Sequence, residues 1–320
     1  MELNKETNRL HDSARQPLDA KGDKQEVRGS WLYALWKFSR PHTIIGTSLS
    51  VLGIFAIAFG RDIDSLALLS VLGAWFACIC GNVYIVGLNQ LEDVAIDEIN
   101  KPHLPLASGE FSVATGRLIV AVTGVLALVS AGLESPYLLA MVAISLAIGT
   151  AYSLPPIRLK RFPFWAALCI FTVRGAVVNL GLFAHYSGSL NIPAAVWALT
   201  AFIIVFTIAI AIFKDIPDLE GDRQFQITTF TIALGQERVF NLARWILTIC
   251  YLGMAVGVVW LPAVNPIFLV STHLGLLALM WWRSFGVDLQ DKIAIASFYQ
   301  FIWKLFFLEY IIFPAACLLG

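Results

Sequence analysis

The chain has 320 residues, of which 58% are hydrophobic and 14% are charged. A soluble domain of this length does not need so much apolar sequence, so the composition argues against a soluble globular protein and predicts a polytopic membrane protein. Lysine plus arginine equals aspartate plus glutamate at 22 each, so the net charge indicates no particular partner.

Residues 1–28 form the first segment, which is polar, carries both charge signs and has few large apolar side chains. Such a stretch cannot bury enough apolar surface to order itself, so we expect a disordered cytoplasmic tail. It has neither the apolar core of a secretion signal nor the Ser/Arg-rich, acid-poor character of an organellar transit peptide. Residues 29–320 are expected to form one all-α membrane domain.

Nine apolar runs follow, each close to the roughly 20 residues that a helix needs to cross a hydrocarbon core. The five cysteines all fall within these runs, where a free thiol acts as a small core residue. The sequence therefore predicts a bundle of nine transmembrane helices. The runs lie at residues 43–60, 66–88, 113–133, 136–154, 163–185, 193–213, 243–261, 265–282 and 296–317.

Basic residues set the orientation of these spans. Eight precede the first span, and most of the others lie in the connections after spans two, four, six and eight. The remaining connections contribute Arg61 alone. This positive-inside asymmetry predicts that the amino terminus and the loops after the even-numbered spans face the cytoplasm, or the stroma of a plastid. With nine spans, the carboxyl terminus is expected on the opposite side.

The second apolar run leads directly into NQLEDVAIDEINKPHLPLASGE, residues 89–110. Asn89, Asp93 and Asp97 recur every four residues, a spacing that stacks their side chains on one face of a helix. Solvated caps are the ordinary explanation for acids at the end of a span. Carboxylates close to the hydrocarbon, however, are costly and usually functional.

A second acidic series, within KDIPDLEGDRQFQITTFTIALGQ at residues 214–236, follows the sixth span. Its Asp218 and Asp222 lie 125 positions after Asp93 and Asp97, which indicates an internal repeat. Two such clusters on one membrane face repel each other unless cations lie between them. Hard oxygen ligands favour Mg²⁺, whose coordination is usually completed by substrate phosphate, so the implied ligand is a diphosphate.

Basic side chains on the same membrane face fit a diphosphate ligand. The loop YSLPPIRLKR, residues 152–161, contains Arg158, Lys160 and Arg161 after the fourth span. Arginine binds phosphate oxygens through its planar fork, and lysine binds them as a point charge. Ordinary positive-inside charge is the alternative explanation for this loop.

Two further cations differ from that loop. Lys214 precedes Asp218 by four residues and is expected to share its face. Arg174 lies inside the fifth span, where an unpaired cation is expensive, so we expect it to face the bundle interior. The sequence assigns it no partner.

These patterns resemble the two motifs of the UbiA superfamily of intramembrane aromatic prenyltransferases, and the likeness covers residues 30–320. Asn89, Asp93 and Asp97 match the motif N-x-x-x-D-x-x-x-D, and the second motif, D-x-x-D-x-x-x-D, is matched by Asp215, Asp218 and Asp222.

Within the superfamily, three runs are most similar to the members that prenylate homogentisate with a phytyl donor. They are SRPHTIIGT (39–47), NKPHLPLASGE (100–110) and FKDIPDLEGD (213–222). These enzymes occur in oxygenic photosynthetic organisms, and the short first segment favours a photosynthetic bacterium.

The resemblance implies Mg²⁺-dependent transfer of a phytyl group from phytyl diphosphate to homogentisate. Loss of CO₂ would give a methyl-prenyl-hydroquinone, a tocopherol precursor. The implied catalytic residues, which with Asn89 would also hold the metal, are Asp93, Asp97, Asp218 and Asp222. The implied substrate-binding residues are Asn89, Arg40, His42, Tyr152, Arg158, Lys160, Arg161, Lys214 and Asp215.

Individual roles follow from the same resemblance. Arg40 and His42, just before the first span, would bind the acceptor carboxylate, although an interfacial anchor is the alternative. His103 would help to close the site. Aromatic side chains would stabilise the allylic cation through their π faces, unless they pack in the core or against lipid. The candidates are Trp75, Phe76, Tyr84 and Phe171.

Other functions stay open at this point. Homogentisate solanesyltransferase, or another quinone or chlorophyll prenyltransferase of the superfamily, shares much of the pattern. A repeat-built transporter also has intramembrane charges, but its binding site lies near the bilayer midplane and not at the helix ends. A CDP-alcohol phosphotransferase is acid-rich too, but its single continuous motif with a glycine and an Ala-Arg pair is not found here.

Overall fold

The computed structural model describes residues 30–225 and 228–320, and within these ranges the protein is helical with no strands. The segment 1–28, expected to be a disordered tail, lies outside the described residues. Nine helices in the described ranges are long and apolar enough to cross a membrane, which confirms the predicted number.

The first five spans lie within residues 41–187. They are α3 (Pro41–Phe59), α4 (Ser65–Glu92), α6 (Val113–Glu134), α7 (Pro136–Ser153) and a composite fifth span. This fifth span consists of α8 (Pro163–Phe171), a π-helical segment η2 (Thr172–Val177) and α9 (Val178–Ser187).

The last four spans are α10 (Ala194–Phe213), α13 (Gln236–Gly257), which continues through the 3₁₀ turn η3 (Val258–Trp260), α14 (Pro266–Phe285) and α15 (Lys292–Leu318). The start of α13 lies seven residues before the expected position. Its first two turns are polar on one side and bury Val239, Phe240 and Ala243 on the other. The average hydropathy of these turns is therefore low, although one of their faces packs in the core.

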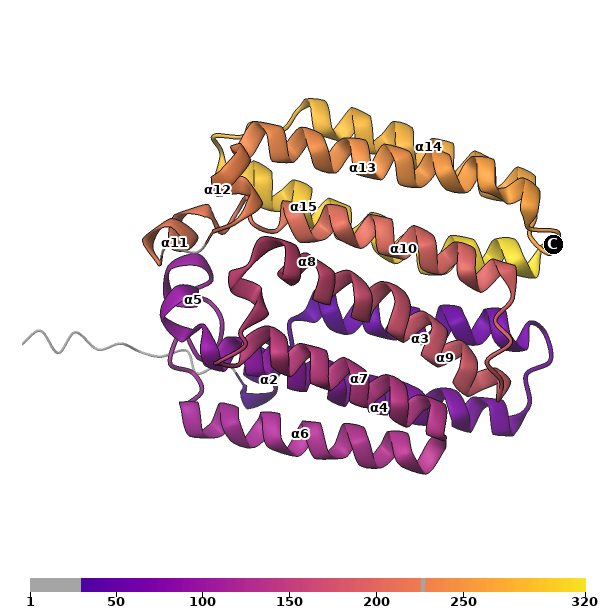
Figure 1. Cartoon of the computed structure of the whole chain (residues 1–320), viewed down its shortest axis with the longest axis horizontal. Coiled ribbons are helices and arrows are strands. Elements are labelled where there is room, and N and C mark those ends of the chain that lie inside the picture. Colours follow the sequence, from indigo (N-terminus) through magenta and orange to yellow (C-terminus); the bar gives the residue numbers. More distant parts are fainter. Residues whose placement is uncertain (1–29, 226–227) are drawn as a thin grey trace, which may run out of the picture.

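The spans form a closed bundle (Figure 1). α4 packs against α6, α10 packs against α13, and α13 packs against α14. The first span, α3, contacts the last one, α15, which closes the ring around an interior space. Close approach depends on small residues: a Cβ on Gly149 would lie 2.7 Å from Ile85, and one on Gly124 would lie 2.7 Å from Tyr84.

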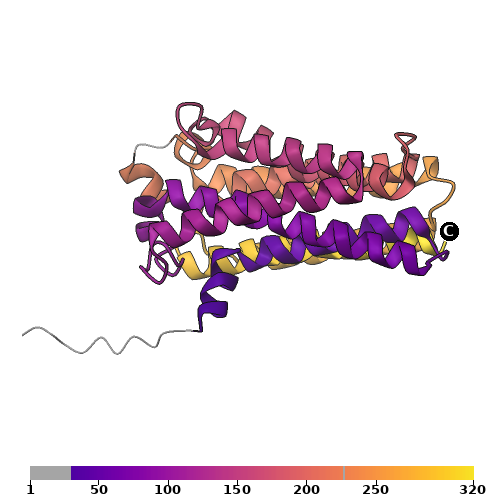
Figure 2. The ribbon, with the colours of Figure 1, turned by 90° about the horizontal axis from the view of Figure 1, so that it is seen from below.

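The short helices gather at one end of the bundle, and the carboxyl terminus lies at the other end (Figures 1 and 2). These helices are α2 (Trp31–Phe38), α5 (Val94–Asn100), η1 (Leu159–Arg161), α11 (Leu219–Gln224) and α12 (Phe230–Leu234). All the predicted motif loops therefore share one end.

Candidate active site

Two adjoining cavities occupy the end of the bundle that carries the motifs. The outer one, which we call the mouth cavity, has a volume of about 1230 Å³ and is lined by Asp93, Asp97, Asp218 and Asp222. The inner cavity, of about 270 Å³, extends between the spans. The two cavities meet at a junction, because several residues line both of them. These residues include Arg40, His42, Asn89, Tyr152, Lys214 and Tyr299.

The first acidic motif does not lie on one continuous helix, which corrects the expectation of a single stacked face. α4 ends at Glu92, Asp93 has φ −117° and ψ 16°, and α5 begins at Val94. The amide of Asn89 still donates to Asp93 across 3.1 Å, as a four-residue spacing requires. The break redirects α5 so that it lies beside α11 from the other half of the chain.

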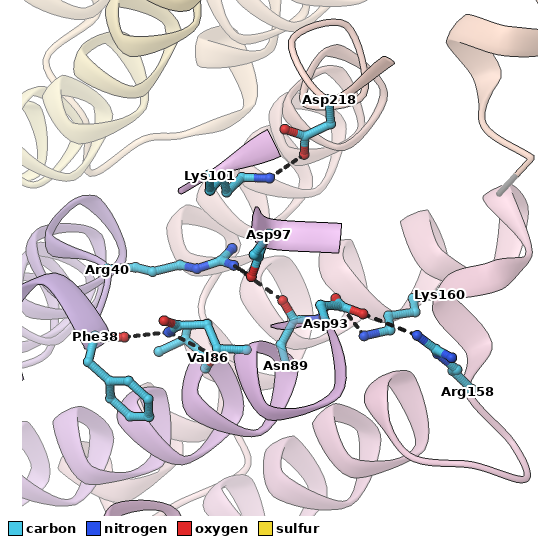
Figure 3. Close-up of polar contacts among 11 residues, drawn as sticks. Phe38, Arg40, Val86, Asn89, Asp93, Asp97, Lys101, Arg158, Lys160 and Asp218 are labelled. Carbon is cyan, nitrogen blue, oxygen red and sulfur yellow. Dashed lines mark hydrogen bonds and ion pairs between the residues drawn. The ribbon is translucent and has the colours of Figure 1, made fainter. Parts of the chain in front are cut away.

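Asp93 is held by two cations of the loop after α7 (Figure 3). Its carboxylate lies 2.7 Å from the ammonium of Lys160 and 3.2 Å from Nη2 of Arg158. Burial lowers the pKa of Lys160, and the facing carboxylate of Asp93 opposes that shift. Two residues of this loop, predicted to bind phosphate oxygens, therefore pair with a carboxylate of the first motif in this structure, and phosphate binding stays a prediction.

Asp97, the last residue of the first motif, lies on α5, which packs beside α11. One of its carboxylate oxygens accepts no hydrogen bond from the described residues. Nη2 of Arg40 is 3.8 Å from its Oδ2, and this buried oxygen accepts no hydrogen bond within the described chain. Burial raises the pKa of Asp97, while the nearby Arg40 and Lys101 oppose the rise. Arg40 also donates to Oδ1 of Asn89 across 3.4 Å, so it contacts two residues of the first motif.

The second motif lies on a turn followed by a short helix. α10 ends at Phe213, and Pro217 prevents the helix from continuing through this stretch. Lys214 pairs with its neighbour Asp215 across 3.0 Å, and not with Asp218 as the four-residue spacing suggested. Asp218 instead pairs with Lys101 of the other half at 2.5 Å.

Asp222 is buried and makes no ion pair in the described part of the chain. Burial, reinforced by the like charges of Asp218 and Asp215, raises its pKa from 3.8 to about 7. A carboxyl group in this state gains most from a bound cation, because the cation removes the cause of its high pKa.

Two contacts tie the repeats together. The first is the ion pair between Lys101 and Asp218, and the second is a hydrogen bond of 3.0 Å from the backbone N–H of Gly221 to Oδ1 of Asn100. The two acidic motifs thus face each other across one mouth, as the internal repeat predicted.

Backbone strain marks the same region. Arg40 and Arg158 are the two non-glycine residues with positive φ in the described ranges, at 53° and 39°. Such conformations cost of order 1–3 kcal/mol each and persist only where surrounding contacts hold them, often at functional sites. Both guanidinium groups contact carboxylates of the first motif.

His42, Arg161 and His103, which were also predicted to act at the site, line the cavities but differ in the protein groups that they contact. His42 packs edge-on against Trp303 with ring centroids 4.8 Å apart. Arg161 lines the mouth cavity, but its guanidinium donates to the carbonyl of Pro156 and covers the ring of Phe162. His103 lines the mouth cavity as well, as expected of a residue that closes it.

The expectation about which aromatic residues lie at the site, ready to stabilise an allylic cation, was wrong. Trp75 and Phe76 are 40% and 45% exposed on the outside of the bundle, and Tyr84 and Phe171 line neither cavity. The aromatic wall comes from α15, which supplies Tyr299, Trp303, Phe306 and Tyr310 to the inner cavity. Their spacing of four, three and four residues is a helical face that could have been found in the sequence.

The oxygen donors fit a divalent cation that binds together with a substrate. No three His, Cys, Asp or Glu side chains in the ranges 30–225 and 228–320 are close enough to hold a metal by themselves. Mg²⁺ is usually bound by one or two carboxylates plus substrate phosphates and water, and not by an all-protein cage. Carboxylates divided between two facing motifs, among them Asp97, whose Oδ2 accepts no hydrogen bond in the described part of the chain, suit that mode of binding.

The UbiA prenyltransferase family matches residues 47–305 of the chain. The chain belongs to this family. With nine apolar helices in the ranges that the structure describes, it is an integral, multi-pass membrane protein. Family membership removes the transporter and the CDP-alcohol phosphotransferase from consideration.

Several relatives share most of the chain. A homogentisate phytyltransferase from Synechocystis sp. is 57% identical, over 89% of this chain and 96% of its own length. Homogentisate phytyltransferase 1 from Arabidopsis thaliana is 40% identical, over 96% and 81%. A homogentisate solanesyltransferase from the same plant is 37% identical, over 88% and 76%.

Solved structures share the fold at low sequence identity. A UbiA homologue from Archaeoglobus fulgidus, bound to GPP and Mg²⁺, has a TM-score of 0.59 and 17% identity, over 88% of this chain and 99% of its own. A structure of digeranylgeranylglyceryl phosphate synthase has a TM-score of 0.63 and 19% identity, over 90% and 99%. The described part of this chain thus has the fold of these solved structures.

Proposed function

We propose that this protein transfers a phytyl group from phytyl diphosphate to homogentisate, with release of diphosphate and CO₂. The observation that carries the proposal is the 57% identity, over nearly the whole of both chains, to a homogentisate phytyltransferase. The phytyl enzymes from Synechocystis and from Arabidopsis are 57% and 40% identical to this chain and the solanesyl enzyme is 37% identical, which favours phytyl diphosphate as the donor.

The mouth cavity is the proposed site of the diphosphate. Asn89 and four aspartates would hold Mg²⁺ there, and when bound the cation would neutralise the diphosphate and make it a better leaving group. Arg158, Lys160 and Lys214 line the same cavity and would bind phosphate oxygens, with Arg161 and Asp215 at its edge. The four aspartates are Asp93, Asp97, Asp218 and Asp222.

The inner cavity is the proposed site of the prenyl chain and the acceptor ring. The allylic carbon would lie at the junction, flanked by Tyr152 and Tyr299, whose π faces favour positive charge as the C–O bond breaks. The inner cavity beyond the junction has a mainly apolar lining, which would keep water away from the inner side of the reacting carbon. Arg40 and His42, also at the junction, would contact the acceptor as it enters.

The bonds of the reaction balance as follows. The donor C–O bond breaks with its electron pair going to diphosphate, and a ring carbon of the electron-rich hydroquinone bonds to the allylic carbon. That ring carbon loses its proton, and the carboxymethyl group loses CO₂ and takes up a proton to become methyl. The product is a methyl-phytyl-hydroquinone.

The basic-residue asymmetry supports an orientation in which the mouth cavity opens to the cytoplasm and the carboxyl terminus lies opposite. Anionic, water-soluble homogentisate would then enter from the aqueous side, while the prenyl chain lies between the spans.

Purified protein incubated with a panel of prenyl diphosphates and either homogentisate or 4-hydroxybenzoate tests the proposal. We expect prenylated product with homogentisate, and phytyl diphosphate preferred over solanesyl diphosphate. Product from 4-hydroxybenzoate but not from homogentisate would refute the proposed acceptor and leave the diphosphate site intact.

A further inference from the structure

Arg174 is a cation that the metal and diphosphate sites do not use. It lies in η2, eleven residues into the fifth span, or roughly 16 Å along the helix from its start at Pro163. It lines the inner cavity and not the mouth cavity, so the diphosphate proposed to bind at the mouth is not its counter-ion.

No acidic side chain in the described part of the chain pairs with Arg174, and its guanidinium makes no hydrogen bond there. Its nearest partners are π faces: Cζ lies 5.0 Å from the ring centre of Trp303 and 5.6 Å from that of Phe306. Aromatic rings attract a guanidinium but do not neutralise it. A charge between membrane helices without a counter-ion is expensive and marks a ligand site.

The local backbone is built to aim this side chain. η2 is a π-helical segment, and such segments are frequent at functional sites. Gly175 allows close approach to α10, because a Cβ there would lie 2.5 Å from Ile204. Asn179, which is fully buried, donates to the carbonyl of Gly175 across 2.8 Å and accepts from the hydroxyl of Tyr310, also at 2.8 Å. This network fixes η2 against α15.

The walls of the inner cavity differ in chemistry. On one side, α4 and α7 present mainly aliphatic and small residues, among them Ile85, Met141 and Leu146, together with the polar Asn82 and Ser145; the apolar part of this wall suits a prenyl chain. On the other side, α15 presents its aromatic row beside Arg174. An aromatic acid fits this second wall, with its ring against the aromatic side chains and its carboxylate at the guanidinium.

We propose that Arg174 binds the carboxylate of the acceptor, and that it is the residue that selects a hydroquinone carrying an acidic side chain. This inference rests on the proposed function, because homogentisate supplies the carboxylate. Arg40 is less suited to this role, since it already contacts Asn89 and Asp97. An arginine is preferred to a lysine at such a site because its planar fork binds both carboxylate oxygens.

A binding experiment separates this role from a structural one. Equilibrium dissociation constants are measured for homogentisate and for its neutral amide, 2,5-dihydroxyphenylacetamide, on the detergent-purified full chain. The variants are Arg174→Gln and Arg174→Lys. The matched control is Arg244→Gln, because Arg244 also lies in a span and over two aromatic rings, Phe240 and Trp281, but lines neither cavity.

We expect Arg174→Gln to weaken homogentisate binding about tenfold to a hundredfold and to leave the amide unchanged, since only the charged hydrogen bonds to the carboxylate are lost. Arg174→Lys should retain part of the affinity, and Arg244→Gln should bind both compounds as the unsubstituted protein does. The KM for phytyl diphosphate should stay within about twofold in all three.

A second variant keeps the test valid if Arg174→Gln does not fold. A Cβ on Gly46 would lie 3.2 Å from Nη1 of Arg174, so Gly46→Ala shifts the guanidinium by a few tenths of an ångström without removing its charge. We expect this variant to lose more affinity for homogentisate than for the amide. Equal losses for the two compounds in Gly46→Ala, or unchanged homogentisate binding in Arg174→Gln, would overturn the assignment of Arg174. An unsubstituted protein that binds and prenylates no homogentisate would instead overturn the proposed function.

Discussion

At the mouth of the bundle, the negative charges of Asp93 and Asp218 are each neutralised by basic side chains. Each carboxylate is held by a cation from another part of the chain, Asp93 by Arg158 and Lys160 and Asp218 by Lys101. Like charges are thereby kept stable near the membrane surface. The same cations line the mouth cavity and are available to phosphate oxygens when a divalent cation takes the carboxylates.

Replacing either carboxylate by an amide tests its proposed role as a metal ligand. We expect Asp93→Asn and Asp218→Asn to lower kcat/KM by at least about a hundredfold, because a neutral amide supplies none of the several kcal/mol of charge stabilisation at stake. Both variants should insert and unfold at nearly the original temperature. The control is Glu220→Gln. Glu220 is an exposed acid on α11, the helix that follows Asp218, and it pairs with Lys292 outside the mouth cavity. Near-normal rates in both aspartate variants would remove these residues from the metal site.

Asp222 predicts a dependence of metal binding on pH. Its pKa in the folded protein is raised to about 7, so below pH 7 a proton occupies the group and competes with the metal. The apparent affinity for Mg²⁺ should therefore fall as pH decreases below about 7, approaching tenfold per pH unit, and should level off above it. Titration of Mg²⁺ between pH 5.5 and 8.5 checks this. An affinity that stays constant over this range would contradict the buried state of Asp222.

Residue types at the site could be predicted from the sequence, but their partners could not. The spacing of Asn89, Asp93 and Asp97 and its repetition were sufficient to find the acidic residues that line the mouth cavity. The ion pair of Lys101 with Asp218 joins residues 117 positions apart, and no local pattern encodes such a contact. Lys214 shows the limit of spacing arguments, because Pro217 ends the helical geometry on which they depend.

At the scale of elements, the site depends on where helices stop. Apart from the start of α13, the spans were predicted within a few residues because membrane thickness fixes their length. The break at Asp93 and the π-helical segment in the fifth span were not predicted, since both arise from tertiary contacts of the segments concerned. These two irregularities place α5 beside α11 and Arg174 at the inner cavity.

Gly221 tests the contact between α5 and α11. A Cβ there would lie 2.5 Å from Oδ1 of Asn100, the acceptor of the N–H of Gly221. We expect Gly221→Ala to separate the two motif helices and to lower kcat/KM by about tenfold or more, with little change in the unfolding temperature of the bundle. Gly275→Ala is the control, because a Cβ at this position in α14 meets nothing within 4 Å. Equal activities of the two variants would show that the spacing of α5 and α11 is unimportant.

At the scale of the whole molecule, the bundle has a polar end that carries both motifs and an opposite end that carries the carboxyl terminus (Figure 1). α2 adds exposed aromatic and aliphatic side chains beside the motif end, as expected of a helix in the headgroup region. The exposed side chains there are Trp31, Leu32, Tyr33 and Trp36.

Cysteine labelling in membrane vesicles tests this polarity. Ser108→Cys and Arg223→Cys, both at exposed positions near the motifs, should react with an impermeant reagent from the same side. Asp62→Cys, in the connection between α3 and α4, should react only from the other side. The background carries Cys317→Ser, because the remaining native cysteines are buried. Labelling of residues 108 and 223 from opposite sides would contradict the nine-span arrangement.

The measurement that tests the central claim most directly follows the carboxyl carbon of homogentisate. Carboxyl-labelled homogentisate and phytyl diphosphate are incubated with the purified protein, with Mg²⁺ or with a chelator, and labelled CO₂ and phytylated product are counted together. We expect one CO₂ per phytyl group transferred in the presence of Mg²⁺, and neither product in chelator. Phytyl transfer that retains the label, or that proceeds equally well in chelator, would contradict this expectation.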